Sequence, residues 1–303
     1  MAPETGSHDF RCGFVAVVGR PNVGKSTLIN ALVGNKVSIV TAKPQTTRHR
    51  ILAILQADNA QVLFVDTPGL HRSAGKAMNR LMNRTAASAL ADADLLLFVI
   101  EAGRWTEEDA DVLGMIKESG VPAIAVLNKV DKLRRKDSLL QELATLAGAH
   151  SFLELVPVSA SKGSGLEALQ GLIVANLPVS GPLYPDTART DRGPEFHAAE
   201  TIREKLTLAL HQELPYGLTV AIERYEEKDG KLTISAIIWV ERDSQKGIVV
   251  GKSGGALKKI GRAARVELKE QLGKPVHLEL WVKVRHNWAD SEQDLKSLGF
   301  DLP

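Results

Sequence analysis

An octapeptide near the start of the chain, G-R-P-N-V-G-K-S at residues 19–26, limits its fold more than any other stretch. It follows the apolar run F-V-A-V-V-G and precedes the helical pattern L-I-N-A-L-V, so it joins a strand to a helix. Glycines let the backbone wrap closely around phosphate groups, and the helix start directs N–H groups and the positive end of its dipole at them. The spacing therefore predicts a phosphate-binding loop (P-loop) inside a layered α/β domain.

The residue types within this P-loop have distinct chemical roles. Lys25 is expected to reach the β- and γ-phosphates and to act in catalysis, and Ser26 is expected to ligate Mg²⁺. An ordinary glycine turn with a surface lysine is the alternative, and the strand–loop–helix context argues against it. The other residues expected to bind the nucleotide here are Gly19, Arg20, Pro21, Asn22, Val23, Gly24 and Thr27.

The first half of the chain alternates short apolar runs with helical patterns. The runs are F-V-A-V-V-G, I-L-A-I-L-Q, Q-V-L-F-V-D, A-D-L-L-L-F-V-I, V-P-A-I-A-V-L-N and F-L-E-L-V-P-V. Runs that are apolar on both faces are typical of a parallel sheet covered by helices. Residues 10–177 are therefore expected to form one α/β domain around a mainly parallel six-stranded sheet.

Polar segments follow the predicted strands and distinguish the nucleotide. The segment D-T-P-G after the third strand supplies an acid for Mg²⁺ and a glycine N–H that can sense a γ-phosphate. The segment N-K-V-D after the fifth strand supplies a carboxylate for the N1–H and N2–H₂ edge of guanine, which adenine lacks. Small residues after the sixth strand allow a backbone N–H to approach the guanine O6. The residues concerned are Asp66, Thr67, Pro68, Gly69, Asn128, Lys129, Asp131, Ser159 and Ala160.

A polar segment, K-P-Q-T-T-R-H-R at residues 43–50, separates the P-loop helix from the second strand. Such a segment can close over γ-phosphate and Mg²⁺ when ordered and open after hydrolysis. These motifs, in this order and spacing, resemble those of the translation-factor-related GTPases. In GTPases of this type a threonine of the segment ligates Mg²⁺, and Thr47 is preferred over Thr46 for that role. The resemblance implies GTP and GDP as ligands, with Lys25, Thr47 and Gly69 as catalytic residues.

One position departs from the common GTPase pattern. Leu70 stands directly after D-T-P-G, where many GTPases have a glutamine that orients the attacking water. This departure is similar to a group of bacterial GTPases with a hydrophobic residue at that position and G-R-P-N-x-G-K-S loops. In relatives of that group the loop asparagine helps to hold a potassium ion. The resemblance implies Asn22 as a K⁺ ligand and slow intrinsic turnover.

The second half of the chain has a different organisation. Residues 178–194, rich in proline and glycine, match neither helical nor strand periodicity and are expected to form a linker. Residues 195–303 follow the order α-β-β-α-α-β and are expected to form a smaller α+β domain.

A second Gly-Lys-Ser lies in this domain, at residues 251–253, but it cannot be a P-loop because Lys246 stands where the first glycine is required. What remains is a G-x-x-G turn between helices. The turn and the element order resemble a type II KH domain, whose G-x-x-G loop clamps the backbone of single-stranded RNA. The expected RNA-binding residues are Gly251, Lys252, Ser253, Gly254, Lys258, Lys259, Arg262 and Arg265.

The charge pattern agrees with that resemblance. The whole chain has a net charge of only +2, whereas residues 242–285 contain eleven Lys and Arg against four Asp and Glu. The basic residues after the turn recur at helical spacing, so they form a stripe beside an apolar face. The alternative, a solvated helix face, is the usual meaning of such a stripe when it stands alone.

Taken together, the chain resembles the Era family of bacterial GTPases from about residue 10 to residue 299. The resemblance implies a monomeric, GTP-controlled factor that binds the 3′ region of 16S ribosomal RNA and acts in assembly of the 30S subunit. It also implies a cytoplasmic location with peripheral contact to the inner face of the cell membrane. The single cysteine, Cys12, agrees with a reducing cytosol, and the lack of a long apolar run predicts a soluble protein.

Two other functions remain open at the level of sequence. One is a signalling GTPase whose C-terminal domain binds protein or membrane, which the basic stripe disfavours. The other is an RNA-binding protein that uses GTP as a structural ligand, which a hydrolysis measurement distinguishes.

Overall fold

The computed structural model describes residues 10–69, 76–133, 137–210 and 217–300. The chain divides into two compact units. Unit 1 contains the residues up to Ser38, Thr47–Arg72 and Met82–Asp191, and unit 2 contains Ile39–Thr46, Ser73–Leu81 and Arg192–Pro303. The polar segment before the second strand is therefore shared between the two units. The predicted domain boundaries around residues 178–194 stay a prediction.

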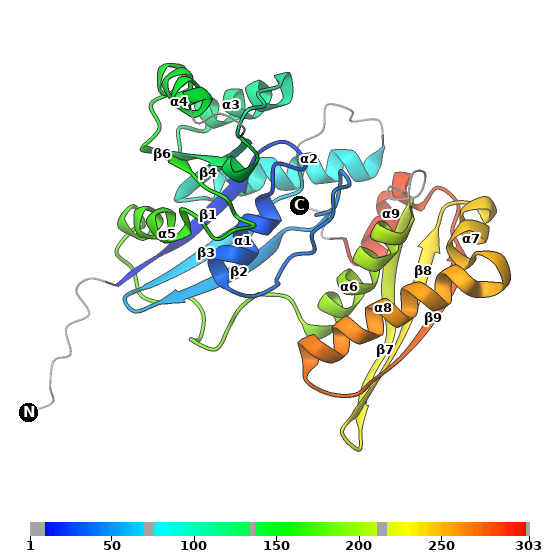
Figure 1. The fold of residues 1–303 in the computed structure, drawn as a ribbon. Coiled ribbons are helices and arrows are strands. Elements are labelled where there is room, and N and C mark those ends of the chain that lie inside the picture. The colour runs from blue at the N-terminus through cyan, green and yellow to red at the C-terminus, as the bar shows by residue number, and fades with distance from the viewer. Residues whose placement is uncertain (1–9, 70–75, 134–136, 211–216, 301–303) are drawn as a thin grey trace, which may run out of the picture. The chain divides into compact units, whose positions relative to one another are not determined.

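Unit 1 is built on a six-stranded sheet in the order β2-β3-β1-β4-β5-β6 (Figure 1). β2 and β3 are antiparallel, and every other neighbouring pair is parallel. The prediction of a mainly parallel six-stranded sheet is confirmed. The strands are β1 (Arg11–Val18), β2 (Ile51–Ala57), β3 (Ala60–Asp66), β4 (Leu95–Glu101), β5 (Ala123–Asn128) and β6 (Glu154–Pro157).

Helices cover both faces of this sheet, which is why its central strands are apolar throughout. One core cluster joins Phe98 of β4 to Ile116 of α3 and Leu146 of α4, all buried. α1 and α5 pack beside β3 and against each other. The helices are α1 (Lys25–Val33), α2 (Ala77–Ala91), α3 (Glu107–Ser119), α4 (Asp137–Ala149) and α5 (Leu166–Ala175), with a 3₁₀ turn η1 (Val130–Lys132). The first residues of α2, up to Leu81, belong to unit 2.

Hydrogen bonds hold much of the predicted linker, residues 178–194, against unit 1. The Ile54 N–H donates to the Arg189 carbonyl at 2.9 Å, and the Leu52 N–H donates to the Asp191 carboxylate at 3.1 Å. β2 is an edge strand, so these bonds satisfy backbone groups that the sheet leaves unpaired. Residues 178–191 therefore run along the sheet and do not form a free tether.

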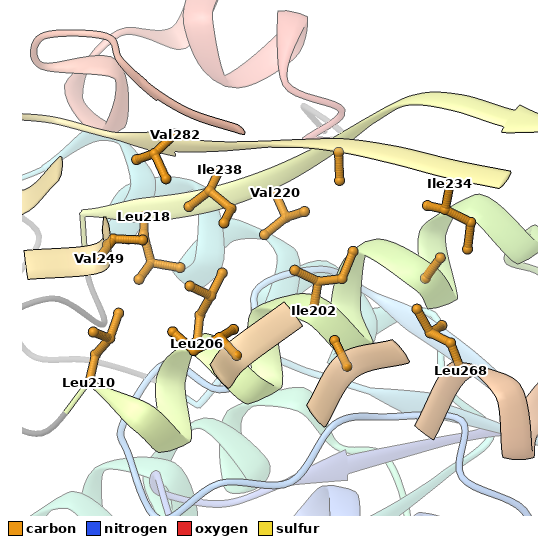
Figure 2. Close-up of a cluster of buried hydrophobic side chains, with 14 of the residues drawn as sticks. Ile202, Leu206, Leu210, Leu218, Val220, Ile234, Ile238, Val249, Leu268 and Val282 are labelled. Carbon is orange, nitrogen blue, oxygen red and sulfur yellow. The ribbon is translucent and has the colours of Figure 1, made fainter. Parts of the chain in front are cut away.

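Unit 2 contains a three-stranded sheet in the order β7-β8-β9, with β7 antiparallel and β9 parallel to β8. Figure 2 shows its core, in which Ile202 and Leu206 of α6, Ile238 of β8 and Leu268 of α8 meet. The predicted order α-β-β-α-α-β is confirmed, and a short helix follows it. The elements are α6 (Pro194–Ala209), β7 (Leu218–Lys228), β8 (Lys231–Val240), α7 (Asp243–Val250), η2 (Lys252–Gly254), α8 (Gly255–Leu272), β9 (Val276–Val284), η3 (Trp288–Asp290) and α9 (Glu292–Ser297).

Candidate nucleotide site and nucleic-acid groove

The predicted nucleotide motifs meet at one edge of the sheet of unit 1. β1, β3, β4 and β5 run parallel, so the residues at their carboxyl ends lie along the same edge. The P-loop follows β1, Asp66 ends β3, Glu101 ends β4 and Asn128 ends β5. Ligands of open α/β sheets bind at this edge, beside the start of the helix that follows the first strand.

Lys25, at the first position of α1, reaches back over the P-loop. Its Nζ donates to the carbonyls of Gly19 at 2.8 Å and Arg20 at 3.1 Å. The side chain is buried, and burial lowers the pKa of Lys25 to about 8, despite the raising effect of the Asp66 charge. A buried ammonium is stabilised by an anion, and a phosphate group supplies one.

Two residues of the N-K-V-D segment bind the next part of the loop. Lys129 Nζ donates to the Asn22 carbonyl at 2.6 Å, and Asn128 Nδ2 donates to the Val23 carbonyl at 2.9 Å. The N–H and C=O of a peptide group point in opposite directions. Carbonyls bound by donors on the outside therefore leave N–H groups turned toward the inside of the loop, where phosphate oxygens need them.

Three oxygen-bearing side chains lie together beside the P-loop. Ser26 Oγ is 2.9 Å from Thr47 Oγ1, which donates to Asp66 Oδ2 at 3.3 Å. Burial raises the pKa of Asp66, and its second oxygen, Oδ1, has no hydrogen-bond partner among the described residues. Two hydroxyls and a buried carboxylate with an unused oxygen fit a Mg²⁺ ion, which prefers hard oxygen ligands and also neutralises the acid.

The structure places the two threonines of the polar segment differently. Thr46 Oγ1 donates to the Lys43 carbonyl at 2.6 Å, within the segment itself, whereas Thr47 lies with Ser26 and Asp66. This arrangement favours Thr47 as the Mg²⁺ ligand, a role that stays a prediction.

The D-T-P-G segment follows Asp66 directly. Thr67 Oγ1 donates to the Val17 carbonyl at 2.9 Å, and this bond ties the segment to β1. Gly69 lies beside the P-loop, because a Cβ built on it would be 3.0 Å from Pro21 Cγ. Leu70, the residue in place of a catalytic glutamine, lies outside the described residues.

The predicted guanine-binding residues also come together. Ser159 Oγ donates to Asp131 Oδ1 at 2.5 Å, and the Ala160 N–H donates to Asn128 Oδ1 at 3.1 Å. The hydrogen bond from Ser159 lowers the pKa of Asp131, so the exposed carboxylate is ionised at neutral pH and accepts hydrogen bonds. Guanine presents two adjacent donors to such a group and adenine does not.

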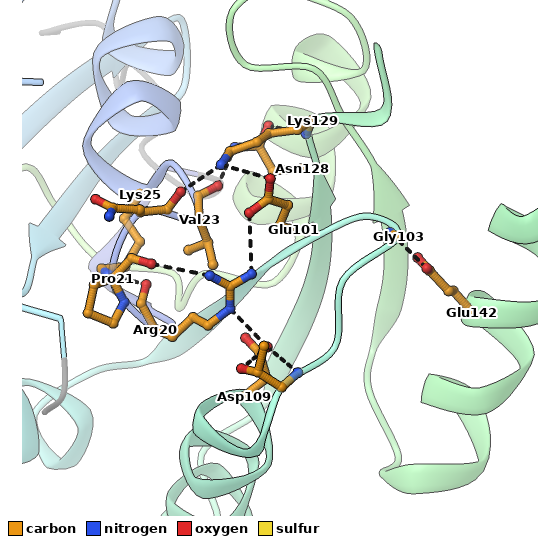
Figure 3. Close-up of polar contacts among 12 residues, drawn as sticks. Arg20, Pro21, Val23, Lys25, Glu101, Gly103, Asp109, Asn128, Lys129 and Glu142 are labelled. Carbon is orange, nitrogen blue, oxygen red and sulfur yellow. Dashed lines mark hydrogen bonds and ion pairs between the residues drawn. The ribbon is translucent and has the colours of Figure 1, made fainter. Parts of the chain in front are cut away.

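Two acids beside the P-loop, Glu101 and Asp109, were not predicted from the sequence (Figure 3). Arg20 Nε donates to Asp109 Oδ2 of α3 at 3.0 Å, and Arg20 Nη2 lies 3.3 Å from Glu101 Oε2 at the end of β4. The position of Glu101 at the carboxyl end of a strand could have marked it. The sequence around Asp109 indicates only a helix start, because Thr106 and Asp109 form the capping box of α3.

Unit 2 contains an open groove of about 880 Å³ between α8 and β9. Five of the predicted RNA-binding residues line it: Gly254, Lys258, Lys259, Arg262 and Arg265. The other three, Gly251, Lys252 and Ser253, form the turn before α8 and are not among the lining residues. The four basic side chains are exposed, while Ile260, Ala264 and Leu268 on the other side of α8 are buried.

The far wall of this groove was missed in the sequence. His277, Leu278 and Leu280 of β9 line it, opposite the basic residues of α8. Strand alternation alone does not show which helix a strand edge faces, so no local signal marked these residues. A groove with a basic wall on α8 and leucines on the opposite wall suits bases that stack beside a phosphate backbone.

Gly251 is required by the turn itself. It has a φ of 71°, and a Cβ built on it would lie 2.6 Å from the Ala256 Cβ. A substitution there would distort the start of α8. Changes of the exposed basic residues therefore test the groove more cleanly than changes of Gly251.

Comparison with known proteins identifies both units. A family model described as "50S ribosome-binding GTPase" matches residues 14–129, and a model described as "KH domain" matches residues 213–289. GTPase Era of Stenotrophomonas maltophilia strain R551-3 is 48% identical over 301 residues, which cover 99% of this chain and all of that protein. GTPase Era of Xanthomonas campestris strain B100 is 49% identical over 298 residues, which cover 98% of this chain and 99% of that protein.

Two solved structures of Era match almost the whole chain. One is a variant of Aquifex aeolicus Era bound to GDP·AlF₄⁻, and the other is Era in complex with MgGDPNP and nucleotides 1506–1542 of 16S ribosomal RNA. Each has a TM-score of 0.93 and 38% sequence identity, and each alignment covers 97% of this chain and 100% of the solved chain.

Gly24 provides a direct test of the P-loop geometry. It has a φ of 102°, and a Cβ on it would lie 2.4 Å from Asn128 Nδ2, the donor to the Val23 carbonyl. We expect Gly24→Ala to weaken the affinity for fluorescent GDP by ~10-fold or more, because the loop loses this bond. Gly114→Ala is the control, since its Cβ would meet nothing within 4 Å in the interior of α3. Equal affinities of the two variants in a fluorescence titration would contradict the prediction.

Proposed function

This chain belongs to the Era family of GTPases, and from that premise we propose that it binds the 3′ region of 16S ribosomal RNA in the groove of unit 2 and acts in assembly of the 30S subunit. It is a P-loop enzyme that hydrolyses GTP to GDP and phosphate. The observation that carries the RNA proposal is the basic wall of α8 facing the apolar edge of β9.

The chain's own residues suffice to orient GTP. The inward N–H groups of the P-loop and the Lys25 ammonium hold the phosphates, and Asp131 with the Ala160 region holds guanine. Bound Mg²⁺ would supply charge neutralisation at the β- and γ-phosphates, with Ser26, Thr47 and Asp66 as its protein ligands. Because Leu70 cannot orient water, we expect slow intrinsic turnover.

Three properties support the RNA proposal. Lys258, Lys259, Arg262 and Arg265 all lie on one wall of the groove, where they can neutralise successive phosphates. Gly261 lies opposite Leu280, and a Cβ built on it would be 3.2 Å from the Leu280 Cδ1. The absence of a side chain at Gly261 therefore leaves room for bases between α8 and β9. In addition, Era with MgGDPNP has been solved in complex with a 16S ribosomal RNA fragment, and that protein matches nearly this whole chain.

A peripheral membrane contact and a cytoplasmic location stay predictions from the family resemblance. Within the described ranges, no helix combines the length and the apolar character needed to cross a bilayer.

Charge reversal in the groove tests the RNA proposal. We expect Lys258→Glu with Arg262→Glu to weaken binding of a 3′-terminal 16S RNA oligonucleotide by ~100-fold or more, because two phosphate contacts become repulsive. Fluorescence anisotropy at several salt concentrations measures this, and the double variant should also show a shallower salt dependence.

The control is Lys231→Glu, an exposed lysine at the start of β8 that does not line the groove. It repeats the Lys→Glu charge reversal at a site in unit 2 outside the groove. This variant should bind the RNA nearly as well as the unchanged protein. Crosslinking in cells, followed by sequencing of the bound RNA, extends the test. An absence of reads from the 3′ end of 16S RNA would overturn the proposal.

We further propose that GTP controls RNA binding through the segment Ile39–Thr46. This segment belongs to unit 2, where the Val40 N–H donates to Glu204 of α6 at 2.9 Å and Arg203 of α6 donates to the Thr46 carbonyl. Its neighbour Thr47 belongs to unit 1 and lies with Ser26 and Asp66. Ordering of Thr47 by nucleotide and Mg²⁺ therefore acts on a segment held by unit 2.

This control predicts thermodynamic linkage between nucleotide and RNA. We expect the RNA affinity with GDPNP to differ from that with GDP by ~5-fold or more, the usual lower range of allosteric coupling. By reciprocity, saturating RNA must change the ratio of the GDPNP and GDP affinities by the same factor. Isothermal titration in both orders measures the two factors, and an RNA affinity that does not depend on the nucleotide would refute the control.

The potassium site implied by the resemblance has a simple test. Asn22 has a left-handed φ of 65°, and its carbonyl is bound by Lys129, so its side chain is the part left to contact an ion beside the phosphates. We expect GTP hydrolysis to be faster in KCl than in NaCl at equal ionic strength, and Asn22→Ala to remove the difference. Equal rates of the unchanged protein in the two salts would exclude a K⁺ role.

A further inference from the structure

Arg20 is the P-loop residue with the most extensive ion pairing among the described residues. Its side chain is 6% exposed, and the Asp109 side chain that accepts from its Nε is 0% exposed. Its Nη1 also donates to the neighbouring Pro21 carbonyl at 3.4 Å. Arg20 therefore fixes the peptide group of Pro21 against α3 by means of a buried ion pair.

Glu101 connects this pair to the guanine-binding segment. Its Oε2 lies 3.3 Å from Arg20 Nη2, and its Oε1 lies 3.2 Å from Lys129 Nζ. Burial alone would raise the pKa of Glu101, but hydrogen bonds and charges from Lys129 and Arg20 outweigh it and lower the pKa below its ordinary value. The carboxylate is thus ionised, with one oxygen on each cation.

Lys129 closes the arrangement. Its Nζ contacts both Glu101 and the Asn22 carbonyl, so the position of the ammonium depends on the acid behind it. The chain of contacts runs from Asp109 through Arg20 and Glu101 to Lys129 (Figure 3). From Lys129 it continues to the Asn22 carbonyl. It leaves the P-loop at Arg20 and returns to it at Asn22, two residues later.

We propose that Glu101 is a positioning residue for guanine nucleotides, which couples the phosphate end of the site to the base end by holding Arg20 and Lys129 at once. Glu101 is not one of the residues predicted to contact the nucleotide, and its two oxygens face Arg20 and Lys129. It acts through the carbonyls of Pro21 and Asn22, which the two cations keep turned outward. This role concerns the nucleotide alone, so RNA binding can fail without affecting it.

A neutral isostere tests the role of the charge. In Glu101→Gln the amide presents one acceptor and one donor, so the donor must face either Arg20 or Lys129 and one contact is lost. We expect release of fluorescent mant-GDP to accelerate by ~10-fold or more, the usual effect of losing a hydrogen bond to a charged group. The KM for GTP should rise while kcat changes little, because the loss affects the bound substrate and the transition state equally.

Glu142→Gln is the matched control. Glu142 accepts a hydrogen bond at 2.7 Å from the N–H of Gly103, which lies two residues after Glu101. Within the described part of the chain it forms no hydrogen bond or ion pair with the P-loop or with Lys129. The same acid-to-amide change there should leave mant-GDP release within twofold of the unchanged protein. If both variants accelerate release equally, the effect is general loosening of this edge and the proposal is wrong.

The variant Arg20→Lys tests the same proposal independently. Lysine keeps the charge but lacks the guanidinium fork that reaches Asp109 and Glu101 together. We expect faster release from this variant, and a double Arg20→Lys, Glu101→Gln variant whose effect is clearly smaller than the product of the two single effects.

Thermal melting in the absence of nucleotide separates positioning from stability. If Glu101→Gln and Arg20→Lys lower the melting temperature without changing mant-GDP release, Glu101 is a structural residue only and the proposal is overturned. Should Glu101→Gln not fold, Glu101→Asp takes its place, because its shorter carboxylate reaches only one of the two cations. Asp109 is left unchanged in these tests since its Oδ2 also accepts the Thr106 N–H and hydroxyl that begin α3.

Discussion

The nucleotide site depends on the direction of five consecutive peptide groups, those whose carbonyls belong to Gly19 through Val23. Each carbonyl accepts from a side-chain donor: Lys25 binds the first two, Arg20 the third, Lys129 the fourth and Asn128 the fifth. The donors to the Asn22 and Val23 carbonyls leave the N–H groups of those two peptides turned inward. A free loop would have no reason to adopt that arrangement, because it concentrates positive dipole ends in one place. Apart from Arg20, which lies in the loop itself, the donors come from α1 and from the end of β5, so the sheet edge is a precondition for the anion site.

Much of this could be predicted from the sequence because the decisive patterns are local. The apolar runs identified the strands, and the spacing of G-x-x-x-x-G-K-S placed the loop between β1 and α1. Glu101 and Asp109 escaped because their function arises only where β4 and α3 pass beside the P-loop. Asp109 also has a sufficient local explanation as a helix cap, so the sequence offers no reason to look for a second partner.

The second Gly-Lys-Ser also shows that local patterns do not reveal contacts between elements that are distant in the sequence. Its spacing excluded a P-loop, and the helical repeat predicted which residues of α8 are buried and which are exposed. The groove needs a second wall, however, and β9 supplies it from more than ten residues farther along the chain. Both glycine turns precede a helix, and side-chain donors enclose the first. The second opens beside a basic helix face, which suits a continuous backbone and not a compact triphosphate.

The polar segment at residues 43–50 is the part of the chain through which the proposed control by GTP would act. Thr46 is held by Arg203 of α6, whereas the next residue, Thr47, lies with Ser26 and Asp66. Successive Cα atoms are ~3.8 Å apart, so one of these residues cannot be displaced far without the other. α6 in turn packs against α8, and Lys205 of α6 forms an ion pair with Glu267 of α8. Under the proposed control, a ligand that orders Thr47 acts through this segment and α6 on α8, the helix that carries the basic wall of the groove. The coupling free energy then equals the difference between the ligand's binding free energies for the two arrangements of the segment.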